Sequence, residues 1–252
     1  MPPECRLYND LAWLWPLWGD VATEYADWCD FVAERIRTEA RRPVQTLLNL
    51  ACGGGKNLWN LKRSFQVTGL DLSPTMLALA RDLNPDVELV EGDMRSFSLG
   101  RTFDAVLVDD GVSHLLREEE LAATFTAAFR HLAPGGVLVT APDATTESFQ
   151  RNRTVVEPAA SAGPGGEVVT FVENVYDPDS TDSQYEVTHL YLIREQARLR
   201  IETDQMTLGL FPLATWRKQL AEAGFEVGEA TYRQGEDTYT VFIGRKAGKA
   251  SE

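Results

Sequence analysis

The residues best suited to chemistry begin in Leu47–Asn57, where an apolar segment runs into Gly53-Gly54-Gly55 and a predicted helix follows. Glycines in such a turn let the backbone bend sharply and approach a ligand that a Cβ would exclude. The free N–H groups of the helix N-terminus favour a carboxylate or a phosphate. The alternative is a loop that is glycine-rich only because it is tight. A dinucleotide fingerprint would need another glycine where the chain has Leu58, so a nicotinamide cofactor is less favoured.

Acidic residues follow the next two apolar segments. Asp71 lies roughly 20 residues beyond the glycine turn, a spacing that suits a hydrogen bond to a ribose diol. Asp93 could accept from an adenine amino group while Met94 packs on the face of the ring. The alternatives are a simple turn at Asp93 and an N-capping role for Asp71 at the helix that begins at Pro74. Ser73 is better placed for that cap.

The glycine turn, Asp71 and Asp93 lie in a part of the chain where predicted strands and helices alternate, and these elements would position them. Short apolar segments predict buried strands at Thr46–Ala51, Val67–Asp71, Val87–Val90, Phe103–Val108 and Val137–Ala141. Helices fit between them at Lys56–Ser64, Pro74–Leu83 and Glu118–Leu132, and Pro134-Gly135-Gly136 turns out of the last one. Such alternation predicts a parallel sheet covered on both faces. The candidate residues then converge in one crevice, because they follow the carboxyl ends of neighbouring strands.

The flanking regions have other patterns. Residues 1–43 are aromatic and predict a helix before Pro43, with apolar positions at Val21, Tyr25, Trp28, Val32 and Ile36. Residues 143–211 predict an antiparallel insertion, with loops at Pro158 and 163–166 and strands at Val168–Tyr176, Gln184–Ile193 and Ala197–Leu208. Residues 212–252 return to the core with a helix at Leu213–Ala223, a Gly224 C-cap, strands near Phe225–Tyr232 and Thr238–Gly244, and a short loose tail.

Five motifs in this order resemble the class I S-adenosylmethionine (SAM)-dependent methyltransferases: 50–55, Gly69–Ser73, Glu91–Arg95, Phe103–Val106 and Leu132–Leu138. Within that family the chain is similar to small-molecule enzymes with an antiparallel insertion, including the sugar N,N-dimethyltransferases of antibiotic pathways. The resemblance implies a doubly wound α/β fold, with a mostly parallel seven-stranded sheet, helices on both faces and an antiparallel β insertion. Residues 1–43 would form a helical lid, 44–142 the SAM-binding core, 143–211 the acceptor side or a dimer contact, and 212–252 the rest of the core.

The resemblance also implies where the cofactor lies. The glycine turn would meet its methionine part, Asp71 its ribose, and Asp93 with Met94 its adenine. Two residues depart from the family pattern: Asn49 replaces a usual acidic residue and Ala51 a common glycine. Asn49 still accepts a hydrogen bond, so we expect altered strength rather than lost binding. The expected cofactor-binding residues are Tyr8, Trp18, Asn49, Ala51, Gly53, Gly55, Asp71, Leu72, Met76, Asp93, Met94 and Val108.

The resemblance places the segment after Val108 beside the transferred methyl group. His114 is a candidate general base, because the pKa of histidine lies near working pH. The alternative is a structural histidine, since amine acceptors need no protein base. Asp109 and Asp110 could orient an acceptor amine or hydroxyl, or one of them could cap the next segment. We expect Asp109 with His114 in catalysis and Asp110 in acceptor binding.

The insertion and the N-terminus supply the remaining candidates. Tyr176 and His189 are expected to line the acceptor pocket, although the insertion could equally form the surface of a homodimer. Tyr8 and Trp18 would close over the cofactor and attract its sulfonium through cation–π contact. Packing of helices is the alternative for most of these aromatic residues.

Composition limits the partners. The formal charge of −14, from 24 Lys and Arg against 38 Asp and Glu, repels phosphate backbones, so nucleic acid is a poor partner. No apolar run approaches the ~20 residues of a membrane helix, and no signal peptide is evident at the N-terminus. The three cysteines follow neither a disulfide nor a zinc spacing, so we expect a cytoplasmic protein without a metal.

The sequence therefore predicts a methyltransferase that moves the methyl group of SAM to a nitrogen or oxygen of a small molecule, leaving S-adenosylhomocysteine. Alignment of the nucleophile and exclusion of water would supply most of the acceleration. Two alternatives stay open at this point: a non-catalytic scaffold that binds the cofactor, and a dinucleotide-dependent oxidoreductase.

Overall fold

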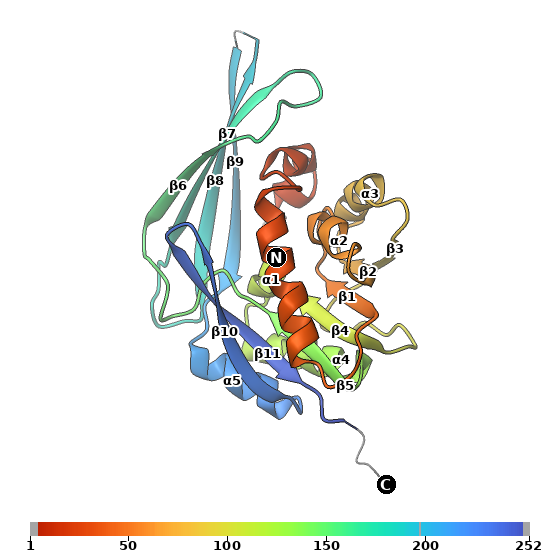
Figure 1. Ribbon diagram of the computed structural model, residues 1–252. Coiled ribbons are helices and arrows are strands. Elements are labelled where there is room, and N and C mark those ends of the chain that lie inside the picture. The colour runs from red at the N-terminus through yellow and green to blue at the C-terminus, as the bar shows by residue number, and fades with distance from the viewer. Residues whose placement is uncertain (1–4, 197, 249–252) are drawn as a thin grey trace.

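The computed structural model describes residues 5–196 and 198–248, which form two sheets. The first has seven strands in the order β10-β11-β5-β4-β1-β2-β3 (Figure 1). Only the pairs of β11 with β5 and β10 are antiparallel, so the predicted mostly parallel sheet is confirmed. Its strands are β1 (Thr46–Leu50), β2 (Gln66–Asp71), β3 (Glu88–Glu91), β4 (Phe103–Val108), β5 (Leu132–Thr140), β10 (Glu226–Gln234) and β11 (Asp237–Arg245).

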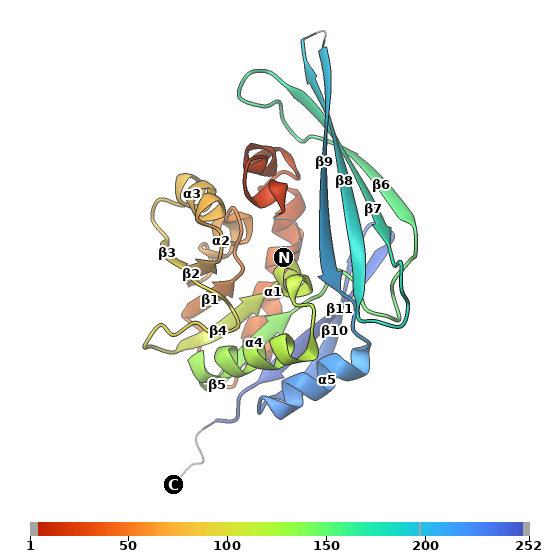
Figure 2. The ribbon, with the colours of Figure 1, turned by 180° about the vertical axis from the view of Figure 1, so that it is seen from behind.

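Helices cover both faces of this sheet. On one face lie α1 (Glu24–Glu39), α2 (Lys56–Leu61) and α3 (Pro74–Leu83), and on the other α4 (Glu118–His131) and α5 (Leu213–Glu222) (Figures 1 and 2). Every residue of β4 is buried, and its side chains alternate between two cores. Ala105 and Leu107 pack with α1, whereas Val106 and Val108 pack with α4 and α5.

The second sheet is antiparallel, in the order β6-β7-β8-β9, and stands above the carboxyl edge of the first (Figure 1). Its strands are β6 (Arg153–Pro158), β7 (Val168–Tyr176), β8 (Gln184–Glu195) and β9 (Arg198–Gly209). The sequence did not predict β6, because Pro158 indicated a loop. Proline is tolerated there since β6 is an edge strand and Pro158 is its last residue.

Most predicted elements are confirmed within a few residues, and α3 and β4 match at both ends. Ser73 caps α3 as expected: its hydroxyl accepts from the N–H of Met76 at 3.2 Å. Pro134-Gly135-Gly136 was expected to form the turn after the helix, and this prediction was wrong. The helix ends at His131, and these three residues belong to the irregular start of β5. Residue 197 and the expected loose tail at 249–252 lie outside the described residues. No described helix is long and apolar enough to cross a membrane.

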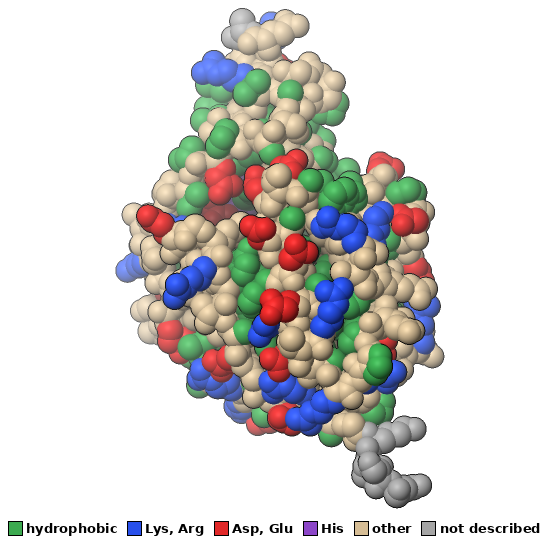
Figure 3. All heavy atoms as spheres, viewed as in Figure 1, with side chains coloured by type: hydrophobic (Ala, Val, Ile, Leu, Met, Phe, Trp, Pro, Cys, Tyr) green, Lys and Arg blue, Asp and Glu red, His purple; other side chains and the backbone are tan. Residues whose placement is uncertain are grey.

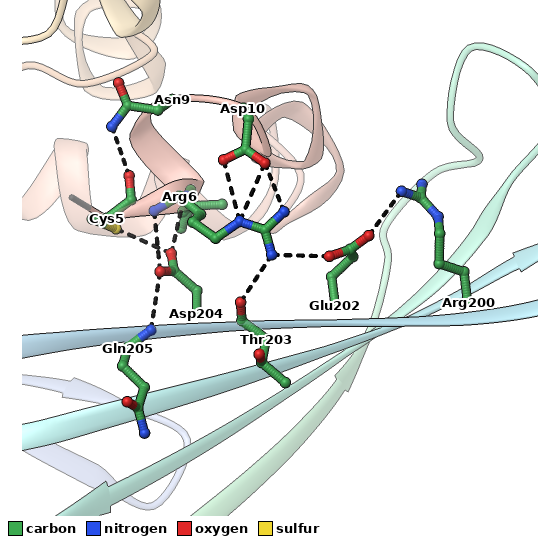
Figure 4. Close-up of polar contacts among 10 residues, drawn as sticks. Cys5, Arg6, Asn9, Asp10, Arg200, Glu202, Thr203, Asp204 and Gln205 are labelled. Carbon is green, nitrogen blue, oxygen red and sulfur yellow. Dashed lines mark hydrogen bonds and ion pairs between the residues drawn. The ribbon is translucent and has the colours of Figure 1, made fainter. Parts of the chain in front are cut away.

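The N-terminal segment, with short helices η1 (Arg6–Tyr8) and η2 (Ala12–Leu17), packs its leucines beneath the second sheet. Asp204 of β9, only 4% exposed, fixes it there (Figure 4). One carboxylate oxygen accepts from the N–H of Arg6 at 3.0 Å, and the other from the N–H of Leu7 at 2.8 Å. The Arg6 side chain adds an ion pair with Glu202 at 2.9 Å, and that guanidinium is partly exposed.

We predict that Asp204→Ala lowers the free energy of unfolding by about 1–3 kcal/mol, because it leaves buried N–H groups without acceptors. Glu202→Ala is the control and should cost less than about 1 kcal/mol, since it removes only a partly exposed ion pair. Urea denaturation of both variants checks this. Equal losses in the two variants would show that Asp204 is no special anchor.

Candidate active site

A cavity of about 1150 Å³ opens at the carboxyl ends of β1, β2 and β4 and continues beneath the second sheet. Segments far apart in the chain line it: the N-terminal segment, the glycine turn, the residues after β4 and β5, and the inner face of the second sheet. The face in Figure 3 is hollowed below the second sheet, and acidic side chains gather around the hollow. The volume exceeds that of an ordinary single-ligand pocket of roughly 300–1,000 Å³, so two small ligands can share it.

The glycine turn adopts left-handed backbone conformations, with φ of +53° at Gly53 and +83° at Gly55. A Cβ on Gly54 would collide with the indole of Trp15, which lies directly over the turn. Gly55 instead packs against α3, where the carbonyl of Gly55 accepts from the Asn84 side chain at 3.0 Å. Close packing therefore explains why glycines are needed here. The groups that pack closely against them in this chain are Trp15 and α3, whereas the sequence predicted a ligand.

Ala51 replaces the glycine common in the family, and its φ is +49°. A left-handed conformation at a residue with a Cβ costs about 1–2 kcal/mol. The space for this methyl group comes from Gly111, where a Cβ would lie only 2.5 Å from the Cβ of Ala51. The alanine is therefore accommodated by a glycine 60 residues later in the chain.

Asp71 joins the glycine turn to the start of α3. Its two carboxylate oxygens accept from the N–H of Gly53 at 2.7 Å and of Ser73 at 2.8 Å. The Ser73 hydroxyl also donates to the carbonyl of Tyr8 at 3.0 Å, which ties the N-terminal segment to the same corner. Burial raises the pKa of Asp71, and the N–H donors oppose that shift. A carboxylate has further lone pairs, so Asp71 can still accept from a ligand.

Asp109 and Asp110 follow β4, and Asp143 follows β5; all three line the cavity. One oxygen of Asp109 accepts from the indole N–H of Trp28 at 2.9 Å and from Asn57 at 2.7 Å. Burial, and then the neighbouring charge of Asp110, raise the pKa of Asp109 to about 7. Desolvation inside the cavity likewise raises the pKa of Asp110 and of Asp143, although both side chains remain accessible to the water of the cavity. A cationic ligand would favour the ionised forms.

His114 ends η3 (Asp110–His114) and meets Tyr8 of the N-terminal segment. The Tyr8 hydroxyl and His114 Nε2 form a hydrogen bond of 2.9 Å, and the rings meet edge to face. Burial lowers the pKa of His114 to about 4, so the imidazole is neutral at pH 7 and its Nε2 can accept a hydrogen bond from the Tyr8 hydroxyl.

Asp93 and Met94 line the cavity beyond β3. Arg95 lies against Asp93 with an Nη2–Oδ2 distance of 2.6 Å, and this hydrogen-bonded pair lowers the pKa of Asp93. The carboxylate is therefore ionised and already shared with a guanidinium. An adenine amino group would compete with Arg95 for it.

The cavity wall includes most of the predicted site residues: Tyr8, Trp18, Ala51, Gly53, Asp71, Leu72, Met76, Asp93, Met94, Asp109, Asp110, His114 and His189. Asn49, Gly55, Val108 and Tyr176 are not among its lining residues. Asn49 and Val108 are at most 1% exposed inside the sheet. Tyr176 lies near the end of β7 on the outer face, where its hydroxyl accepts from Arg151 at 2.7 Å.

Sequence reasoning missed Asp143 and Glu173. Asp143 follows a parallel strand directly after Ala141-Pro142, so the rule that found Asp71 could have found it. Glu173 pairs across the strands with His189, and the two side chains meet at 3.1 Å. The strand register needed for that contact cannot be read from either strand alone. Among the described residues, no set of three or more His, Cys, Asp or Glu side chains is arranged to hold a metal ion.

Comparisons with known proteins agree with this geometry. A family described as "Methyltransferase domain" matches residues 47–136. The dTDP-3-amino-3,6-dideoxy-alpha-D-glucopyranose N,N-dimethyltransferase of Streptomyces fradiae is 42% identical over 131 residues, 51% of this chain and 50% of that one. The dTDP-3-amino-3,4,6-trideoxy-alpha-D-glucopyranose N,N-dimethyltransferase of Streptomyces venezuelae is 36% identical, over 71% of this chain and 79% of the relative.

A solved structure extends the match to the second sheet. SAM-bound CalS10, described as an amino pentose methyltransferase from Micromonospora echinaspora, has a TM-score of 0.77 and 31% identity, covering 89% of this chain and 92% of its own. The residues of this chain fit the same group, because the glycine turn, Asp71 and the carboxylates after β4 share one cavity. The chain therefore belongs to the class I SAM-dependent methyltransferases that act on small molecules, with SAM as cofactor and S-adenosylhomocysteine as product.

Proposed function

We propose that this enzyme methylates the nitrogen of a small amine, of the amino-sugar kind. The observation that carries the proposal is the position of Asp109, Asp110 and Asp143, which lie in the same cavity as the glycine turn and Asp71. Carboxylates attract an ammonium group and hold it by charge-assisted hydrogen bonds, whereas a neutral hydroxyl gains much less. The relatives named above, N,N-dimethyltransferases of amino sugars, support the same choice.

In this proposal the cofactor lies along the glycine turn, next to the N-terminal segment. Gly53 and Asp71 would bind its methionine and ribose parts, and Met94 its adenine. SAM supplies a methyl group that is already activated, because its sulfur leaves with the bonding electron pair. Trp15 and Trp18 line the cavity on the N-terminal side, where they would shield the reacting atoms from water.

The acceptor nitrogen must lose a proton before it can attack; Asp109 suits that step, and Tyr8 suits the orientation of the nitrogen. Asp109 has a pKa of about 7, so it can take the proton of an ammonium group near neutral pH. Tyr8 can accept a hydrogen bond from the nitrogen while its own hydroxyl hydrogen points to neutral His114. Proximity and alignment supply the rest of the acceleration.

The oxidoreductase alternative finds no support in the site. Leu58, which replaces the third glycine of a dinucleotide fingerprint, is fully buried in the core between α2 and the sheet. The scaffold alternative predicts tight SAM binding without turnover of any acceptor, so activity itself separates the two.

We also infer a homodimer and a cytoplasmic location. The outer face of the second sheet carries exposed apolar side chains, Val156, Val168, Leu190, Leu199 and Ile201. A second copy of the chain could cover this face. All three cysteines are unpaired, as is usual in a reducing compartment. The acidic composition continues to disfavour nucleic acid.

The proposed function is tested by incubating the protein with SAM and two matched acceptors, an amino sugar and the same sugar with a hydroxyl in place of the amine. We expect N-methyl and N,N-dimethyl products and stoichiometric S-adenosylhomocysteine from the amine only, measured by mass spectrometry. Methylation of the hydroxyl sugar instead would disprove the choice of nitrogen.

We predict that Asp71→Ala weakens SAM binding by about 1–3 kcal/mol, roughly 5- to 150-fold, because the variant leaves polar partners unpaired. Calorimetric titration measures this. Asp82→Ala, an exposed residue of α3 outside the cavity wall, is the control for loss of one negative charge and should bind normally. Unchanged affinity of the Asp71 variant would rule out the ribose contact.

The raised pKa of Asp109 predicts a pH-dependent stability. The folded state binds the Asp109 proton more tightly than the unfolded state, so this stabilisation is present at low pH and is lost as pH rises through about 7. Asp109→Asn avoids burying the charge and keeps an oxygen for Asn57. The melting temperature of the variant, relative to the unaltered protein without ligands, should therefore rise between pH 5 and 8.

Scanning calorimetry at each pH measures this difference, with Asp82→Asn as the control. A difference that stays constant with pH would show that Asp109 ionises normally in the folded state.

A further inference from the structure

The acceptor part of the cavity has an apolar wall. Its lining residues are Phe149, Val175, Tyr185, Val187, Met206 and Leu208, which belong to one packed cluster. Tyr185 and Val187 are only 3% exposed, and they come from the inner face of β8. An acceptor that fits against this apolar wall must have a substantial apolar surface of its own.

The charge in the same space is strongly one-sided. Besides Asp109, Asp110 and Asp143, the carboxylates of Glu157 and Glu173 line the cavity beneath the second sheet. After desolvation, the nearby carboxylates of Asp110, Glu173 and Asp109 also raise the pKa of Asp143, in that order, because like charges repel one another. An anion placed among them would be repelled, whereas a cation would relieve the repulsion.

The cationic side chains of the wall are already engaged. Among the described lining residues these are Lys56, Arg95 and Arg153. Lys56 donates to the carbonyls of Trp18 and Gly19, the second at 2.9 Å. Arg95 is paired with Asp93 at 2.6 Å and Arg153 with Asp237 at 2.7 Å. Recognition of a diphosphate ordinarily uses unpaired arginines or lysines.

His189 supplies an independent sign of a ligand. It lines the cavity and is 3% exposed, and its Nε2 meets Glu173 at 3.1 Å. Its Nδ1 is buried and has no hydrogen-bond partner among the described residues. A buried polar atom without a partner is costly, so a hydroxyl or amine of a bound acceptor is a natural partner for it.

We propose that the acceptor is an amphipathic amine without a phosphate group, held by Asp110, Asp143 and His189 at its polar end and by the apolar wall at the other. The proposal rests on the function proposed above and narrows its substrate. It separates this enzyme from relatives whose names specify dTDP-linked amino sugars, because a diphosphate would meet carboxylates without a free cation.

The test uses the full chain saturated with S-adenosylhomocysteine and calorimetric titration with three probes. These are dTDP, an alkyl glycoside of 3-amino-3,6-dideoxyglucose, and the same glycoside with a hydroxyl at position 3. We expect the amine glycoside to bind at least about tenfold more tightly than the hydroxyl glycoside, and dTDP not to bind at about 1 mM.

Asp143→Asn should reduce the preference for the amine at least about fivefold by removing one charge-assisted contact, whereas Asp82→Asn should leave it unchanged. Binding of dTDP below about 0.1 mM, or equal binding of the two glycosides, would overturn the proposal. Turnover with SAM distinguishes failure of the acceptor proposal from failure of N-methylation. Methylation of a dTDP-linked amino sugar but not of the glycoside would overturn this proposal and leave N-methylation intact, whereas transfer to the hydroxyl glycoside alone would refute N-methylation itself.

Discussion

The site depends on the register of β1, which pairs in parallel with β2 on one side and β4 on the other. Leu50 is the register partner of both Leu70 and Val108. The residues that follow these three partners are Ala51, Asp71 and Asp109, and they therefore lie side by side at the edge of the sheet. A one-residue slip would turn every side chain of a strand to the opposite face. Because both faces are packed against helices, burial holds this register in place.

This constraint explains why the site residues that follow the parallel strands, such as Asp71 and Asp109, could be predicted from the sequence. Buried parallel strands appear as continuous apolar runs, and polar residues that follow them must gather at one edge. Helix α3 could be placed because Ser73-Pro74 combines a capping side chain with a proline at the first helical position. These signals are local, so they survive without any knowledge of tertiary contacts.

The part of the site formed by the N-terminal segment and the second sheet depends on contacts between segments that are distant in the chain. No local sequence pattern predicts such contacts. Tyr8 meets His114 across 106 positions, and Asp204 binds the backbone of Leu7 across 197. Alternation along β7 separates two faces but does not say which one meets the cavity, so Tyr176 was expected inside and lies outside. Pro158 was judged by its propensity alone, whereas its place at the end of an edge strand is what permits it in β6.

The acidic cavity also gives the strongly negative composition a local meaning. A SAM sulfonium and an ammonium acceptor are both cations when they bind, and they must share one cavity before the ammonium loses its proton and attacks. The mutual repulsion of two cations falls when carboxylates surround them, and Asp109, Asp110 and Asp143 lie at the strand ends where the two ligands would meet. Desolvation in the cavity, and then the neighbouring carboxylates, raise the pKa values of Asp109 and Asp143 in the free protein, and cations that enter the cavity would favour their ionised forms. The same electrostatics that favour this encounter disfavour a diphosphate, and selectivity for the acceptor then follows from the charge of the cavity.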